Sequence, residues 1–292
     1  MYIVDILAEC LPQAALYALM AVGLVVIYRT TRVLSFAQGY LGLICGYLFY
    51  TVAKSSAGTP FIVPALIAVV IAAVLGFALY YVFLARISAA HGDFVPVVYT
   101  IAIAWLIQAA VGIIWDGQSY GLRSPLSRSG NHLGLGIVLS PLQIAMILLA
   151  VVFIGALSSW MRWSRLGAIM RAVSDNRTLV LCYGLSVRRA CGLAWALGTI
   201  GAMLVGVAYG VSSSVDFSIV DLGFAAFPAI LIGGLDSISG VLIGSVVIAF
   251  AETLVGSQLG GQYSEPVSMA LALIVLLLRP QGLLGTKSLV RV

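Results

Sequence analysis

Six long stretches of this chain contain no Asp, Glu, Lys or Arg, and each is at least 19 residues long: 10–28, 33–53, 55–85, 94–115, 129–161 and 190–215. A helix needs about 20 apolar residues to cross the hydrocarbon of a bilayer. Continuous runs of this kind favour helices over the alternating strands of a membrane barrel. Charged residues make up 9% of the chain, against about 25% in soluble domains. The sequence therefore predicts an all-α polytopic membrane protein, with residues 1–292 forming a single transmembrane domain.

The part of the chain after residue 215 is harder to divide into spans. The stretches 222–235 and 237–251 are short for an ideal crossing, and Glu252 and Glu265 interrupt the apolar sequence beyond them. Broken or re-entrant helices are therefore expected here. Counting 190–215, 222–234, 240–257 and 266–278 as crossings gives nine spans in total, with eight as the alternative.

Orientation is predicted from the basic residues, because Lys and Arg in short loops collect on the cytosolic side. Six of the 15 Lys and Arg residues lie in one loop between long apolar runs: Arg162, Arg165, Arg171, Arg177, Arg188 and Arg189. The loops on the same side would hold Arg29, Arg32, Arg86 and His91, and those on the other side Lys54, Arg123 and Arg128. The C-terminus would be cytosolic, because it carries Arg279, Lys287 and Arg291. The net charge of +5 thus reflects orientation in a bilayer and gives no reason to expect nucleic acid as a partner.

A weak internal repeat links two apolar segments. The residues Phe36-Ala37-Gln38-Gly39 precede Gly46, which lies ten positions after Phe36, and Phe224-Ala225-Ala226-Phe227 precede Gly234 at the same offset. With nine spans these segments enter the membrane from opposite faces. That arrangement is expected of an inverted repeat around a central pathway, although chance identity in apolar sequence explains the match equally well.

The arginine-rich loop, residues 162–189, also carries apolar residues at helical spacing, namely Val173, Leu179, Val180 and Tyr183. We expect a short amphipathic helix that ends at Gly184, with Ser174 and Asp175 suited to capping it. Such a helix would offer an apolar face and a basic edge to a soluble partner. The alternative is a loop that only fixes topology and touches anionic lipid.

Several motifs, in order from about residue 14 to residue 285, resemble those of permease subunits of branched-chain amino-acid ABC importers. The motifs are Tyr17-Ala18-Leu19 with Gly23, Ser35-Phe36-Ala37-Gln38-Gly39, Arg171-Ala172 with Asp175-Asn176 and Gly184-Leu185-Ser186, Gly233-Gly234-Leu235-Asp236-Ser237 with Gly240 and Gly244, and Arg279-Pro280-Gln281-Gly282-Leu283-Leu284-Gly285. The chain departs from the family at Gln38 and Tyr40, where His and Glu are frequent, and at Val180, where a small Ala is usual. The first two departures bear on substrate choice, and the third bears on packing at the coupling loop.

The resemblance implies a half-transporter in a bacterial cytoplasmic membrane. A second permease subunit, identical or homologous, would complete the pathway, an extracytoplasmic binding protein would deliver substrate, and two cytosolic ATPases would hydrolyse ATP. The chain itself contains no GxxxxGK[ST] motif for binding nucleotide phosphates, so no cofactor is expected in it. The implied pathway residues are Phe36, Ala37, Gln38 and Gly39, and the implied ATPase-coupling residues are Arg171, Ala172, Asp175, Asn176, Val180 and Gly184.

Glu252 is the one acid within an otherwise apolar crossing, where charge is expensive and often functional. It could bind a substrate ammonium, or it could be protonated, bonded to a neighbouring helix or near the outer interface.

Asp236 with Gly233, Gly234 and Gly240 indicates a tight cytosolic turn. His91 and His132 stand alone, without metal-ligand spacing, so neither a metal site nor an enzyme site is expected. The alternative function is a self-sufficient secondary transporter or channel in which Glu252 relays a proton or cation.

Overall fold

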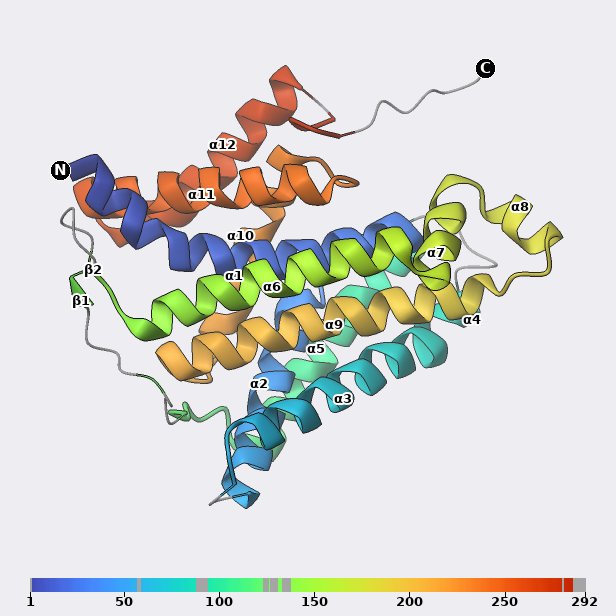
Figure 1. Ribbon diagram of the computed structural model, residues 1–292, viewed down its shortest axis with the longest axis horizontal. Helices are drawn as coiled ribbons and strands as arrows, with labels where there is room; N and C mark the ends of the chain where they lie inside the picture. Colours follow the sequence, from blue (N-terminus) through green and yellow to red (C-terminus); the bar gives the residue numbers. More distant parts are fainter. Residues whose placement is uncertain are drawn as a thin grey trace.

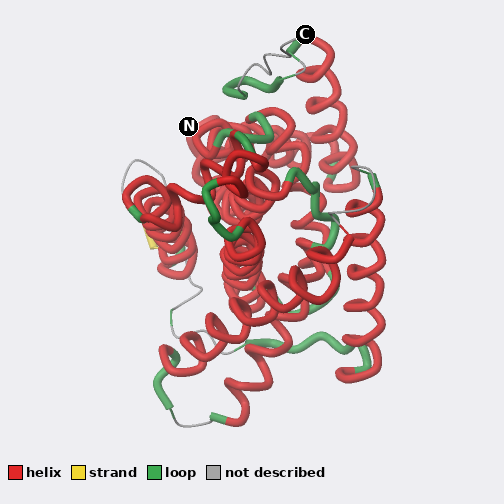
Figure 2. The backbone as a smooth tube through the Cα atoms, turned by 90° about the vertical axis from the view of Figure 1, so that its right-hand side faces the viewer, coloured by secondary structure: helices red, strands yellow, loops and turns green. Residues whose placement is uncertain are grey.

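The computed structural model describes residues 2–56, 59–87, 94–122, 126, 131–132, 138–279 and 281–285. Almost all of this is helical, as Figures 1 and 2 show. In chain order the helices are α1 (Tyr2–Thr31), α2 (Gln38–Ser55), α3 (Ile62–Leu79), the π-helical turn η1 (Tyr80–Leu84), α4 (Ala85–Ile87), α5 (Val95–Trp115), α6 (Pro141–Trp163), α7 (Arg165–Asp175), α8 (Arg177–Cys182), α9 (Val187–Ser212), α10 (Ser218–Gly233), α11 (Ile238–Leu259), the 3-10 turn η2 (Gly261–Tyr263) and α12 (Ser264–Leu278). The strands β1 (Asn131–His132) and β2 (Val138–Leu139) form a small antiparallel hairpin. The prediction of an all-α polytopic fold is confirmed.

Seven helical segments in the described residues are long and apolar enough to cross a membrane: 9–31, 62–84, 95–115, 141–163, 187–212, 238–259 and 261–278. The predicted spans 33–53 and 222–234 correspond to α2 and α10, which fall outside this set. α10 is a shorter apolar helix, and the first half of α2 is mostly buried within the protein. Seven of the nine predicted crossings thus coincide with segments that can span a membrane, and the other two correspond to helices that fall short of this criterion.

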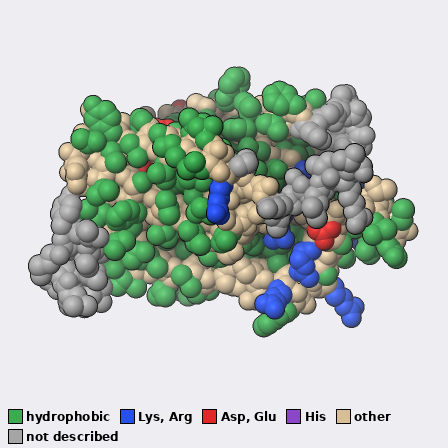
Figure 3. Space-filling model, turned by 90° about the horizontal axis from the view of Figure 1, so that it is seen from above, with side chains coloured by type: hydrophobic (Ala, Val, Ile, Leu, Met, Phe, Trp, Pro, Cys, Tyr) green, Lys and Arg blue, Asp and Glu red, His purple; other side chains and the backbone are tan. Residues whose placement is uncertain are grey.

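Two helices form the centre of the bundle. In the most apolar window of each span, 89% of α1 and 72% of α9 are buried, against 22% in α3 and 28% in each of α5 and α6. The outer helices therefore turn apolar side chains toward the lipid. Figure 3, which looks onto the side of α11 and α12, shows a largely apolar face on which Lys and Arg gather in the half of the molecule that contains α7 and α8.

Glycines bring the central helices into backbone contact. A Cβ added to Gly206 of α9 would lie 2.2 Å from the carbonyl oxygen of Gly42 in α2, and one added to Gly198 of α9 would lie 2.9 Å from that of Gly23 in α1. Small residues allow this approach, which drives helix association in a bilayer through van der Waals packing. The four helices α1, α2, α9 and α10 consequently form one tightly packed block.

The tail differs from its expectation in one respect. α11 continues without a break from Ile238 through Glu252 to Leu259, so this segment is a full-length span. The carboxyl group of Glu252, in the middle of this helix, accepts hydrogen bonds from side chains of α1. α10 keeps the expected shortness, with Pro228 inside it.

The loop 162–189 forms two helices, α7 and α8, at the end of the bundle opposite the N-terminus (Figure 1). The predicted capping by Ser174 and Asp175 is wrong, because both residues belong to the last turn of α7. The caps are Ser164, whose hydroxyl accepts from the Gly167 N–H, and Asn176, whose side chain accepts from the Leu179 N–H. These side chains satisfy N–H groups that a helix start leaves free.

Candidate functional site

The predicted pathway segment begins a helix inside the bundle. α1 ends at Thr31, residues 32–37 are not helical, and α2 starts at Gln38. Within this connection the Phe36 N–H donates to the hydroxyl of Thr100 in α5 (3.1 Å). Gln38 lies against Gly23, eight residues or about 12 Å before the end of α1. The first residue of α2 therefore lies deeper in the bundle than the last residue of α1.

Gln38 fills the junction between α1, α2 and α9. Its side chain is fully buried, and its Nε2 donates to the carbonyl oxygen of Gly198 (2.8 Å). A Cβ on Gly23 would lie 2.6 Å from this Nε2, so only a glycine fits there. The Oε1 atom has no hydrogen-bond partner among the described residues. The Gln38 amide is thus enclosed between the backbones of α1, α2 and α9, a contact that we call the seam.

The two segments of the weak repeat touch each other. The rings of Phe36 and Phe227 stack with centroids 4.9 Å apart, and a Cβ on Gly223 would lie 2.4 Å from the Cα of Gly39. Farther along, Gly46 of α2 approaches Val215, just before α10. α2 and α10 are therefore antiparallel neighbours, which is the packing that an inverted repeat requires.

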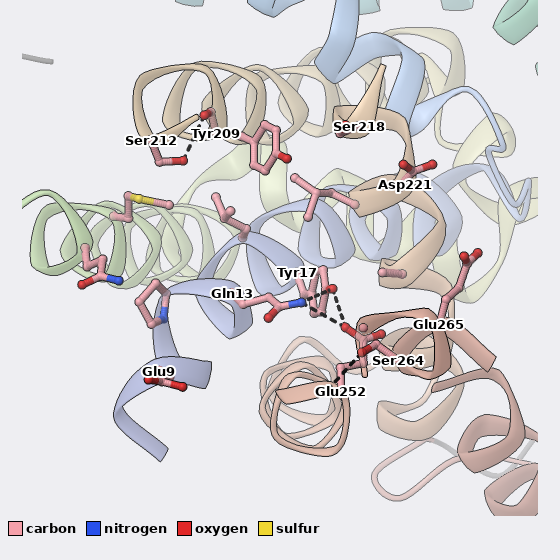
Figure 4. A pocket seen from close by; sticks show the side chains of 17 residues that line it. Glu9, Gln13, Tyr17, Tyr209, Ser212, Ser218, Asp221, Glu252, Ser264 and Glu265 are labelled. Carbon is pink, nitrogen blue, oxygen red and sulfur yellow. Dashed lines mark hydrogen bonds between the residues drawn. The ribbon is translucent and has the colours of Figure 1, made fainter. Parts of the chain in front are cut away.

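A polar pocket of about 510 Å³ opens toward the other end of the bundle, between α1, α6, α9, α10, α11 and the η2–α12 turn (Figure 4). Glu252 contributes its carboxylate and is 5% exposed. Its Oε2 accepts from the Tyr17 hydroxyl (2.6 Å) and from the Gln13 Nε2 (3.0 Å). The carboxylate is thus bonded to a neighbouring helix, which is one of the alternatives for this residue, and it also lines a pocket.

The pocket lining is acidic. It includes Glu9, Asp221, Glu252 and Glu265, and no Lys or Arg is among the described residues that line it. Polar groups complete the wall: Gln13, Gln143, Tyr17, Tyr209, Ser212, Ser218 and Ser264. Sequence reasoning did not name Gln13, and it named Tyr17 only as part of a family motif, without placing it at the site. The available signal was a polar side chain and a tyrosine four residues apart in an apolar run, since this spacing puts both on one helix face.

The same face of α1 connects the pocket with the seam at Gln38. Leu16 lines the pocket, Met20 follows one turn later and is fully buried, and Gly23 follows next against Gln38. The methyl group of Met20 lies 3.3 Å from the Cβ position of Gly42 in α2. Along α1, therefore, the pocket gives way to the first turns of α2, which occupy the space between α1 and α9.

The predicted coupling residues lie on α7 and α8 or directly beside them, since Asn176 stands between the two helices and Gly184 follows α8. Arg171 donates to the carbonyl oxygens of Met161 and Arg162 and so ties α7 back to the end of α6. Val180 is 4% exposed and packs inward. Ala172 accepts, through its carbonyl, the N–H of Asn176, and Asp175 ends α7. These residues form part of the unit made by α7 and α8, and Arg171 attaches this unit to α6.

The outer side of this unit is apolar and uncovered. Trp163 is 83% exposed and Tyr183 is 76% exposed, and Leu179 and Leu181 are also exposed. Gly184 ends the unit with a φ of +70°, a left-handed conformation that favours glycine, and the space around its Cα is open. The geometry leaves a basic, apolar surface at one end of the bundle.

The predicted turn at Gly233, Gly234 and Gly240 joins α10 to α11. The backbones of Gly233 and Gly240 touch, and Gly234 has a φ of +109°. The C-terminal motif packs on this turn, because the Leu283 N–H donates to the carbonyl oxygen of Ile232 (2.7 Å) and the Leu284 N–H to that of Gly233 (3.1 Å). Two motifs distant in sequence thus form one compact structure.

Six residues named from the sequence lie outside the described part of the chain: His91, Arg123, Arg128, Pro280, Lys287 and Arg291. His132 belongs to the short strand β1. In the part that the structure describes, no three His, Cys, Asp or Glu side chains are grouped so as to hold a metal ion.

Comparison with known proteins places this architecture in a family. Residues 6–279 match the family model described as the branched-chain amino acid transport system / permease component. The chain is 25% identical to the high-affinity branched-chain amino acid transport system permease protein BraD of Pseudomonas aeruginosa, covering 96% of this chain and 94% of BraD. It is also 25% identical to the permease protein LivH of Escherichia coli K12, covering 92% and 91%. A probable LivH of Methanocaldococcus jannaschii is 25% identical over 96% of this chain and 92% of that protein. The chain belongs to the family of permease components of branched-chain amino-acid ABC transporters, and it is a multi-pass membrane protein.

Proposed function

We propose that this chain forms one half of an ATP-driven importer for an amino acid or a similar small polar metabolite, such as an amide or urea. The observation that carries the proposal is the division of the bundle into two functional ends. A polar pocket with a buried carboxylate occupies one end, and an exposed apolar and basic helix pair occupies the other. The packed block of α1, α2 and α9 connects them.

At the pocket, Glu252 binds the ammonium group of the substrate. The carboxylate is fixed in place by Tyr17 and Gln13, and the acidic lining favours a positively charged group. The extracytoplasmic binding protein delivers substrate to this end. Phe36, Ala37, Gln38 and Gly39 form the closed part of the pathway, where the substrate stops until α1, α2 and α9 separate.

At the opposite end, α7 and α8 bind cytosolic ATPase subunits, which supply the energy, since the chain has no phosphate-binding loop of its own. This assignment puts the C-terminus in the cytosol and the N-terminus outside. Alternating access needs two global states, and ATP binding and hydrolysis change their relative stability. A second permease subunit completes the pathway.

Affinity purification of the tagged chain in mild detergent, co-expressed with its genomic neighbours, tests the proposal. We expect ATPase subunits to co-purify with the wild type. Leu181→Asp should abolish this recovery, because Leu181 lies on the exposed side of α8. Leu259→Asp is the matched control, because it changes a similarly exposed leucine at the other end of the bundle. Equal recovery with both variants would contradict the docking assignment.

The alternative, a secondary transporter, draws on the same buried Glu252, which lies in one pocket with Glu265 and could carry a proton or cation. The purified chain reconstituted without ATPases distinguishes the two functions. Uptake driven by an ion gradient and lost in Glu252→Gln would support the secondary transporter. Uptake that requires both ATPase and ATP would support the importer.

A further inference from the structure

The π-helical turn η1, which continues α3, meets the first turns of α9, directly after the loop that holds α7 and α8. A π turn is a one-residue irregularity that is rare and frequent at functional sites. Before it, α3 is locked to α9, because a Cβ on Gly76 would lie 2.5 Å from the carbonyl oxygen of Trp195. η1 follows within four residues, so the irregularity begins where this fixed contact ends.

Both tyrosines of this turn face the entrance to α9. Tyr80 is almost fully buried, with 2% of its surface exposed. Tyr81 packs with Phe77, the ring centroids 4.6 Å apart, and both rings close over Gly192. A Cβ on Gly192 would come within 3.0 Å of both rings. The π turn is therefore shaped to the surface of α9 at residue 192.

Two arginines of the coupling region hold this contact. The guanidinium of Arg188, in the first turn of α9, lies over the ring of Tyr81, 5.9 Å from the ring centroid. The Nη2 of Arg177, the first residue of α8, lies 3.9 Å from the Cys191 sulfur. Cys191 in turn contacts the carbonyl oxygen of Thr30 near the end of α1 (3.7 Å). One junction thus joins α8, α9, α3 and α1.

We propose that this junction transmits movement of the ATPase-bound helices to α3, with Arg188 and Tyr81 as positioning residues. The inference rests on the proposed function. Movement of α8 displaces Arg177 and the start of α9, and the π turn follows because Gly192 and Arg188 hold its rings. The rest of α3 stays attached to α9 at Gly76. In this proposed movement, α3 bends at the π turn, which is at its cytosolic end.

The test compares matched variants in proteoliposomes that contain the complete complex, with substrate moved per ATP hydrolysed as the readout. Arg188→Ala should lower this ratio about two- to fivefold, the range expected for loss of a cation over an aromatic face. Arg188→Lys and Tyr81→Phe should retain most of it, since cation and ring persist. Arg189→Ala is the control, because Arg189 is the adjacent exposed arginine.

Tyr81→Leu should reproduce the loss, and Arg188→Ala combined with Tyr81→Leu should be no worse than either change alone. A merely structural role predicts lower stability and less ATPase recovery in both variants, so thermal unfolding and co-purification are measured in parallel. Normal coupling in Arg188→Ala and Tyr81→Leu, with an intact wild-type complex, would overturn the relay and leave the proposed function standing. A wild type that recruits no ATPase would overturn both.

Discussion

Gln38 and Glu252 are both polar side chains buried in apolar helices, yet their surroundings are different. Gln38 lies in a seam where glycines bring three backbones together, with one amide hydrogen bond and an Oε1 that has no partner among the described residues. Glu252 borders a pocket and receives two hydrogen bonds from α1. A polar residue in a membrane helix therefore has no fixed role. We propose that packing makes the Gln38 site a seal and the Glu252 site a recognition site.

The largest expected effect concerns the packed block of α1, α2, α9 and α10, which we propose closes the pathway. Gly206→Ala should lower the free energy of unfolding by about 1–3 kcal/mol, because the added methyl would overlap the Gly42 backbone. Gly112→Ala in α5 is the control, since its Cβ would meet nothing within 4 Å, and Ala favours helix. Thermal unfolding in detergent measures both. Equal stability of the two variants would contradict the close approach of α2 and α9.

The next prediction tests whether Gln38 closes the pathway. Gln38→Ala should allow substrate to leak through proteoliposomes without ATP, because the side chain that fills the junction is removed. Gln38→Leu should keep the junction closed and fold with similar stability. It loses a hydrogen bond worth about 0.5–1.5 kcal/mol and also removes an unpaired buried acceptor costing about 1–3 kcal/mol. A tight Gln38→Ala variant would show that another part of the protein forms the seal.

Glu252 should respond in the opposite way. Glu252→Gln should raise KM about tenfold or more for a substrate with an ammonium group, because a hydrogen bond to a charged group contributes about 1.5–3 kcal/mol. Passive leak should stay at the wild-type level. Glu265→Gln, in the same pocket, is the control and should have a smaller effect. Uptake kinetics over a substrate panel would show the difference, and an unchanged KM would remove Glu252 from the recognition site.

The smallest effect concerns Asp216, an acid near the pocket that has a capping role. Burial raises the pKa of Asp216, but hydrogen bonds from Ser214, Ser218 and Ser119 lower it more, so the pKa lies below its ordinary value. The stabilisation is therefore present above the unfolded-state pKa of about 3.9 and is lost as pH falls through the folded-state pKa. Asp216→Asn should cost about 0.3–1 kcal/mol at pH 7, because it removes a negative charge next to the N-terminus of α10.

Unfolding measurements from pH 7 downward check the Asp216 prediction. The wild type should approach the stability of Asp216→Asn in acid, since the protonated carboxyl is neutral like the amide. A difference that stays constant with pH would show that the carboxylate charge has no part in holding the start of α10, where the Ser218 N–H donates to Asp216 (2.9 Å).

Much of the fold could be predicted because hydropathy is a local property. The apolar runs located α1, α5, α6 and α9, and Gly184 marked the end of α8. The partners of Glu252 in α11 could not be predicted, because Tyr17 and Gln13 lie more than 230 residues away in sequence. Ser174 and Asp175 were misassigned as caps because Asn176, the next residue, has the same capping chemistry.

For the candidate site, the sequence identified the Gln38 segment and Glu252 but not how they differ. Pairs such as Gly23 with Gly198 belong to separate helices, so nothing in either segment alone indicates that their backbones meet around Gln38. The π turn at Tyr80 was also invisible, because an irregular turn in an apolar run leaves hydropathy unchanged.

The most direct test of the central claim is side-specific labelling of two introduced cysteines in the complete complex, with the native cysteines replaced. Ser218 lies in the pocket, and Ser35 is a fully buried residue just before Gln38, so Ser218→Cys and Ser35→Cys probe the two sites. A membrane-impermeant thiol reagent added outside should modify Ser218→Cys at rest and leave Ser35→Cys unmodified, and Ser35→Cys should become reactive from the cytosolic side during ATP turnover. Outside labelling of Ser35→Cys at rest, or no labelling during turnover, would contradict a pathway that is closed at Gln38 and opened by ATP.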